Sequence, residues 1–139
     1  MPTEEIKTYQ LRKCKTFFIS LHLKTSKFNQ MEYKPRIADK MLAKKLASKG
    51  AILIEGPKWC GKTTTAEQQA KSILYMDNPA SLETNLQMAE IEPSVLLDGD
   101  TPRLIDEWQL APKLGDAIRF EVDHRHEVGQ FVLTGSAVP

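Results

Sequence analysis

The sequence predicts an α/β fold with three layers, in which helices cover both faces of a mainly parallel sheet. Two observations carry this prediction. From residue 35 to residue 134, short apolar segments of strand length alternate with segments whose apolar residues recur with helical spacing. A loop with the pattern G-x-x-x-x-G-K-[ST] follows the first apolar segment, and a polar segment without Gly or Pro follows the loop. This order of strand, loop and helix is the context in which the pattern binds phosphate, so a P-loop NTPase-like fold is expected.

Length and composition fit one globular domain. The chain has 139 residues, of which 41% are hydrophobic and 27% charged, and its formal net charge is +1. This balance gives no overall field for nucleic acid or a membrane surface, and no segment reaches the length of a transmembrane helix. A disulfide between Cys14 and Cys60 would tether the glycine-rich loop. We therefore expect a soluble protein of the reduced cytoplasm, without a membrane partner.

Residues 1–30 differ in character from the rest of the chain. They carry six Lys/Arg and only two Asp/Glu. The alternation of Phe17, Ile19, Leu21 and Leu23 with other side chains is consistent with an edge strand. Two other interpretations are a loosely ordered basic extension and an over-long reading frame whose natural start is Met31. The domain boundary is placed at residue 31, so that residues 31–139 form the second unit.

The first half of this unit begins with a helix that starts at Pro35 and stops at Gly50, which is placed as the C′ residue. Its apolar face consists of Ile37, Ala38, Met41, Leu42 and Leu46. Its remaining surface carries Lys40, Lys44, Lys45 and Lys49. A solvated face is the favoured interpretation of these lysines, and a nucleic-acid patch is the alternative. A strand at 51–55, the glycine-rich loop and a helix from about residue 62 to residue 71 follow.

The second half continues the alternation. Strands are expected at 72–77, 103–108 and 130–134, and helices at 81–90 and from Pro112 onward. Pro93 is expected to break the helix at 81–90, and residues 98–102 form a dense turn signal.

The glycine-rich loop carries the chemistry of triphosphate binding. Its two glycines allow backbone N–H groups to point at phosphate oxygens, and the N-terminus of the next helix adds partial positive charge. Lys62 would reach the β- and γ-phosphates, and the hydroxyl of Thr63 would bind Mg²⁺. Trp59 would either stack on a base or cover apolar surface. The residues expected to bind the nucleotide are Gly56, Pro57, Lys58, Trp59, Cys60, Gly61, Lys62, Thr63 and Thr64.

Hydrolysis needs further groups, which the third and fourth strands supply. Asp106 ends an apolar run and is the expected second ligand of Mg²⁺. Glu107 follows it and is the candidate base for an attacking water. Thr134, at the tip of the fourth strand, is expected to contact the γ-phosphate or the water, with Ser136 as its alternative. The expected catalytic residues are thus Glu107, Lys62 and Thr134.

At these residues the chain resembles the AAA-type ATPases of bacteria and archaea, and more narrowly a group of predicted ATPases with a further C-terminal domain of unknown function. The resemblance covers residues 31–139. It is carried by the loop 56–63, by Leu104-Ile105-Asp106-Glu107-Trp108-Gln109, by Ala111-Pro112-Lys113-Leu114 and by Leu133-Thr134-Gly135-Ser136. It implies Walker A, Walker B and sensor 1 roles at the positions named above, with Mg²⁺ and ATP as ligands.

Two features depart from that family. Gly115 stands where an aromatic residue is expected, and the fifth strand, arginine finger, sensor 2 lid and C-terminal domain have no counterpart in this sequence. Since the resemblance implies the sheet order 5-1-4-3-2, strand 51–55 would be an exposed apolar edge. We therefore expect a partial ATP-binding domain with weak or absent ATP binding, background turnover and self-association at micromolar concentration.

Two other functions stay open at this point. One is a nucleotide-binding module without turnover. The other is a different P-loop enzyme, either a GTPase or a small-molecule kinase. The sequence contains no Asn-Lys-x-Asp pattern for reading guanine, and the adjacent Asp106 and Glu107 favour water over a kinase acceptor.

Overall fold

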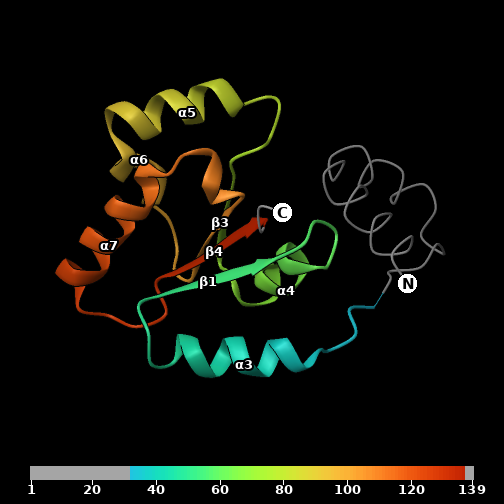
Figure 1. Ribbon diagram of the computed structural model, residues 1–139. Coiled ribbons are helices and arrows are strands. Elements are labelled where there is room, and N and C mark those ends of the chain that lie inside the picture. The colour runs from blue at the N-terminus through green and yellow to red at the C-terminus, as the bar shows by residue number, and fades with distance from the viewer. Residues whose placement is uncertain (1–31, 137–139) are drawn as a thin grey trace, which may run out of the picture.

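The computed structural model describes residues 32–136, whose four strands form a single parallel sheet (Figure 1). The strands are β1 (Ala51–Gly56), β2 (Ser72–Tyr75), β3 (Arg103–Asp106) and β4 (Phe131–Ser136). Their order across the sheet is β1-β4-β3-β2, and every neighbouring pair is parallel. This confirms the predicted α/β fold, and within these four strands it is the order that the family resemblance implies.

Helices cover both faces of the sheet (Figure 1). They are α3 (Ile37–Leu46), α4 (Lys62–Gln69), α5 (Leu82–Ile91), α6 (Pro93–Leu97), the short 3₁₀ helix η1 (Trp108–Leu110) and α7 (Lys113–Arg125). The two faces form two separate apolar cores. One core joins Leu42 and Leu46 of α3 and Ala66 of α4 to Leu104 and Val132 of the sheet.

The other core lies between the sheet and α5, α6 and α7. The sheet contributes the buried side chains of Ile105 from β3 and of Phe131 and Leu133 from β4 to this core. Successive side chains of a strand point to opposite faces, so the continuous apolar runs of β3 and β4 supply both cores at once. The expected three layers are therefore present.

The first helix differs from its prediction. It ends at Leu46 rather than near residue 49, and of its predicted apolar face only Leu42 and Leu46 are buried. Ile37 and Met41 are 82% and 55% exposed. Gly50 is also not a helix-terminating residue with positive φ. A Cβ atom at this position would lie 2.4 Å from Cγ1 of Val122 in α7, so close packing between chain segments is what requires glycine there.

Other elements are close to their predicted ranges, with local differences. Pro93 does not only end α5 but begins α6 as its first residue, where proline costs no hydrogen bond. β3 ends at Asp106, and Glu107 has φ 57° and ψ 45° in the left-handed region, so the predicted strand 103–108 is two residues too long. β4 continues past Thr134 to Ser136.

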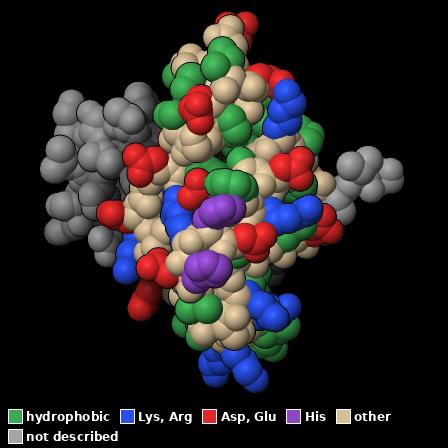
Figure 2. All heavy atoms as spheres, turned by 90° about the vertical axis from the view of Figure 1, so that its left-hand side faces the viewer, with side chains coloured by type: hydrophobic (Ala, Val, Ile, Leu, Met, Phe, Trp, Pro, Cys, Tyr) green, Lys and Arg blue, Asp and Glu red, His purple; other side chains and the backbone are tan. Residues whose placement is uncertain are grey.

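The expectations for residues 1–30 fall outside the described residues. Within the described part, no helix combines the length and apolar character needed to cross a membrane. The side of the molecule that carries α7 shows acidic and basic side chains interspersed, without a patch of one sign (Figure 2).

Candidate nucleotide-binding site

The sheet brings the predicted site residues to one edge. In a parallel sheet the carboxyl ends of all strands lie on the same side. The glycine-rich loop leaves β1 there and enters α4, while Asp106 and Thr134 occupy paired positions near the ends of β3 and β4. Segments separated by up to 78 positions in the sequence, from Gly56 to Thr134, therefore meet at a single site.

The loop curls around the amino group of Lys62, whose side chain is buried. The Nζ atom donates hydrogen bonds to the carbonyl oxygens of Gly56 and Pro57, at 3.0 and 2.7 Å, and lies 3.9 Å from Sγ of Cys60. Gly61 has φ 90°, a value that favours glycine, and it starts α4. The loop thus holds a buried cation at the position where the pattern G-x-x-x-x-G-K-[ST] requires one.

The loop also contains a residue under backbone constraint. Trp59 has φ 67°, in the left-handed region that L-residues with large side chains rarely adopt, and its side chain is 37% exposed. Strain of this kind persists where the surrounding structure dictates the conformation, and it is frequent in ligand-binding loops. Thr64 follows in the first turn of α4 and is buried, as are its neighbours Thr63 and Thr65.

Asp106 is the centre of the polar cluster. Its side chain is fully buried, and its Oδ1 atom accepts hydrogen bonds from the hydroxyl groups of Thr63 and Thr134, each at 2.6 Å. The second oxygen, Oδ2, is buried without a hydrogen-bond partner among the described residues. Buried carboxylate oxygens normally have a hydrogen-bond partner or bind a cation, so this atom is suited to act as a metal ligand.

The environment of Asp106 disfavours its charge. Burial raises the pKa of its carboxyl group above the ordinary value, and the nearby carboxylates of Asp77 and Glu107 raise it further. The hydrogen bonds from Thr134 and Thr63 act in the opposite direction. A divalent cation would relieve this cost, because it favours the ionised form. The donor set of one carboxylate and hydroxyl oxygens fits Mg²⁺, which usually binds few protein groups and keeps several waters or phosphate oxygens.

Glu107 is held by two contacts. Its backbone N–H donates to Oγ1 of Thr134 at 3.4 Å, and its carboxylate accepts a hydrogen bond from Nε2 of Gln109 at 2.5 Å. Ser136, the predicted alternative to Thr134, does not join this cluster, since its buried Oγ has no hydrogen-bond partner among the described residues. The geometry thus brings Thr134, rather than Ser136, to Asp106.

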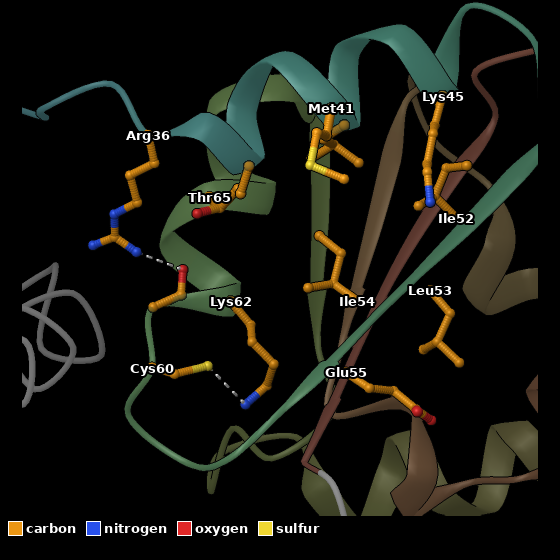
Figure 3. A pocket seen from close by; sticks show the side chains of 13 residues that line it. Arg36, Met41, Lys45, Ile52, Leu53, Ile54, Glu55, Cys60, Lys62 and Thr65 are labelled. Carbon is orange, nitrogen blue, oxygen red and sulfur yellow. Dashed lines mark hydrogen bonds between the residues drawn. The ribbon is translucent and has the colours of Figure 1, made fainter.

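A pocket of about 380 Å³ lies beside the loop, between α3, β1 and the start of α4 (Figure 3). Its apolar lining includes Met41 and Ile54, and its polar lining includes Arg36, Lys62 and Thr65. Pockets that join an apolar wall to a few charged groups are typical of small-molecule sites. Met41, one of the two exposed apolar residues of α3, therefore lines this pocket rather than the core.

Three residues at the site were missed from the sequence. Arg36 reaches the start of α4 from the segment before α3, Gln109 contacts Glu107, and Asp77 influences Asp106 from the end of β2. The adjacency of Gln109 to the Asp-Glu pair was visible in the sequence. No sequence signal places Arg36 or Asp77 at the site, because both reach it through tertiary packing.

A comparison with known protein families identifies the region that contains the strands and the loop. The model of a family described as AAA domain matches residues 48–139. The chain belongs to this AAA domain family. The family is one of P-loop ATPases, whose members generally bind Mg-ATP, and this agrees with the four-stranded parallel sheet and the loop geometry. Searches of curated proteins and of solved structures gave no significant match.

Proposed function

We propose that this AAA domain binds Mg-ATP through its glycine-rich loop, and that Asp106 and Thr63 hold the metal. The observation that carries the proposal is the hydrogen bonding of the buried Asp106 carboxylate. One of its oxygens accepts hydrogen bonds from the hydroxyl groups of Thr63 and Thr134, while the other has no hydrogen-bond partner among the described residues. An ordinary buried aspartate would gain nothing from such an arrangement, because burying a half-satisfied carboxylate costs free energy.

The nucleotide would occupy the loop and the adjoining pocket. Backbone N–H groups of residues 56–64 would surround the phosphates, and Lys62 would leave the carbonyl oxygens of Gly56 and Pro57 to bind phosphate oxygens instead. The base and ribose would lie in the pocket of about 380 Å³, whose apolar wall includes Met41 and Ile54. Trp59 remains a second candidate for base contact because it is partly exposed in the same loop.

For hydrolysis, Glu107 would accept a proton from the attacking water and Thr134 would orient the water or the γ-phosphate. When bound, Mg²⁺ would neutralise charge that develops on the phosphates. Lys62 would add to this stabilisation from the loop. The alternatives are nucleotide binding without turnover and phosphoryl transfer to an acceptor other than water. Hydrolysis differs from both in its need for a base that activates water, the role proposed for Glu107.

Replacement of Lys62 tests the binding site. We expect Mg-ATP to shift backbone signals of the loop in a two-dimensional NMR titration of the 139-residue chain, and Lys62→Ala to remove these shifts. The variant loses the cation that meets the phosphates, whereas Lys71→Ala removes an exposed lysine just after the C-terminal end of α4 and serves as the control. Failure of the wild-type chain to bind, or equal binding by Lys62→Ala, would contradict the proposal.

Replacement of Glu107 tests the chemistry. We expect Glu107→Gln to keep ATP binding near that of the wild-type chain, because the amide preserves size and hydrogen bonding, and to abolish any phosphate release that the wild-type chain shows. Assays with ATP and GTP, each with and without an added acceptor, distinguish hydrolysis from kinase activity. A loss of ATP binding as severe as that of Asp106→Ala would assign Glu107 a structural or metal-binding role instead.

A further inference from the structure

Arg36 is fixed beside the glycine-rich loop by the cap of α3. Its backbone N–H donates to Oδ2 of Asp39 at 2.6 Å, in the first turn of the helix. Tyr33 donates its hydroxyl to the other oxygen of Asp39 at 2.5 Å, and its ring centroid lies 5.9 Å from Cζ of Arg36. Asp39 thus organises this segment from both sides, so that the side chain of Arg36 leaves the helix in a defined direction (Figure 3).

That direction leads to Gly61. The Nη1 atom of Arg36 lies 3.4 Å from the carbonyl oxygen of Gly61, across 25 positions of sequence (Figure 3). A Cβ atom at Gly61 would come within 2.0 Å of Nη1, so the guanidinium packs directly on the glycine. Gly61 is therefore required twice, once for its positive φ and once for the approach of Arg36. The contact puts a second cation, besides Lys62, at the start of α4.

The two cations line the same pocket. Lys62 approaches the loop from inside, and Arg36 approaches its outer side at the first turn of α4, where Thr65 also lines the pocket. A guanidinium group presents several N–H donors in a plane, which suits the paired oxygens of a phosphate group. The N-terminus of α4 favours negative charge at the same place.

We propose that Arg36 is a further phosphate-binding residue for nucleoside polyphosphates, acting as a second cation at the loop while it positions Gly61. This inference rests on the proposed ATP binding and adds a residue that neither the loop pattern nor the Asp-Glu pair includes. The family match begins at residue 48, so Arg36 also lies outside the matched region.

The test compares neutral and charged replacements in the full chain. Arg36→Gln keeps a hydrogen-bonding amide but removes the charge. We expect this variant to bind Mg-ATP and inorganic triphosphate with an affinity lower by about ten-fold or more, since hydrogen bonds to charged groups contribute this much. Arg36→Lys, which restores the charge without the planar group, should recover part of both affinities. Arg119→Gln removes an exposed guanidinium group of α7 that does not line the pocket, so this control variant should bind both ligands like the wild-type chain.

Salt dependence separates a charge contact from a purely structural role. NMR titrations at low and high potassium chloride should show a smaller loss of affinity with salt for Arg36→Gln than for the wild-type chain, because one charge contact is absent. An equal salt dependence, no recovery in Arg36→Lys, or a loss confined to ATP but not triphosphate would overturn the inference. If Lys62→Ala abolishes binding while Arg36→Gln leaves it unchanged, the proposed function stands and this inference alone fails; a wild-type chain that binds neither ligand overturns both.

Discussion

Asp106 shows how a single residue at this site is placed at a cost to stability. Its carboxyl group is fully buried, and only one of its oxygens has hydrogen-bond donors among the described residues. Because burial raises its pKa, folding disfavours the ionised form of this carboxyl group relative to the unfolded chain. Sites that bind metal and nucleotide commonly trade stability for function in this way.

We therefore predict that Asp106→Asn stabilises the chain without ligand. The pKa of Asp106 is raised on folding, so its contribution to stability is present below the unfolded pKa of about 3.9 and is lost as the pH rises through the higher folded value. The variant cannot ionise and keeps its acceptor oxygen for Thr63 and Thr134. Its melting temperature should exceed that of the wild-type chain by a few degrees near neutral pH.

Circular dichroism melting curves near neutral pH and at about pH 4 check this prediction. The difference between the two proteins should shrink at the acid pH, where the wild-type carboxyl group becomes protonated. Thr134→Val serves as a comparison, because it removes one donor to Asp106 and should lower the melting temperature. A variant less stable than the wild-type chain near neutral pH would show that the hydrogen bonds outweigh the cost of burial.

Site residues could be predicted where they belong to a recognisable local pattern in the sequence. Lys62 and Thr63 lie within a short pattern, and Asp106 ends an apolar run, so their roles were proposed from local sequence alone. Their mutual placement agrees with that expectation, since Thr63 and Asp106 share a hydrogen bond across 43 positions. Arg36 leaves no such signal, because its position depends on the cap at Asp39 and on the packing of α3 beside α4.

At the scale of elements, the role of Gly50 was the least predictable feature. Gly50 follows a helix and was expected to end it, but its backbone does not require positive φ. The helix ends earlier, at Leu46, and the backbone N–H of its C-cap residue Ala47 bonds back to the carbonyl oxygen of Ala43. Only the arrangement of α7 over the start of β1 shows why the side chain must be absent, and an arrangement of this kind is a tertiary property.

This packing gives a prediction for the junction of α7 and β1. Gly50→Ala should lower the free energy of unfolding by about 1–3 kcal/mol, because its Cβ would overlap Cγ1 of Val122. In a Val122→Ala background the same substitution should cost less than half as much, since both γ-carbons that it meets are gone. Urea unfolding of the four proteins measures this coupling, and additive effects would show that Val122 is not the obstacle.

Elements with strong periodicity were predicted well, and their ends were not. α7 carries Leu114, Ala117, Ile118 and Val122 on one face as expected, and all four belong to or pack against one core. Gly115, the departure from the resembled family, lies under Trp108, since a Cβ there would be 3.1 Å from the indole. The end of β3 was missed because Glu107 has a left-handed conformation that its residue type does not favour and that no local pattern in the sequence indicates.

At the scale of the whole molecule, β1 lies at the edge of the described sheet. It pairs only with β4 among the described strands, so one side of its backbone has no strand beside it in that part of the chain. Leu53 is 45% exposed, and the strand contains neither Lys nor Pro, the residues that commonly protect such edges. The order 1-4-3-2 follows the expectation from the family resemblance, and the consequence for association remains a prediction.

We predict that the 139-residue chain self-associates through this edge at micromolar concentration, and that Leu53→Lys weakens the association by about ten-fold or more, since an inserted charge on an edge strand opposes pairing. Ile91→Glu is the matched control, because it replaces an apolar residue that is 77% exposed at the end of α5, away from β1. Sedimentation equilibrium over a range of concentrations measures all three proteins. A wild-type chain that stays monomeric, or an equal effect of both substitutions, would exclude the β1 edge as the contact.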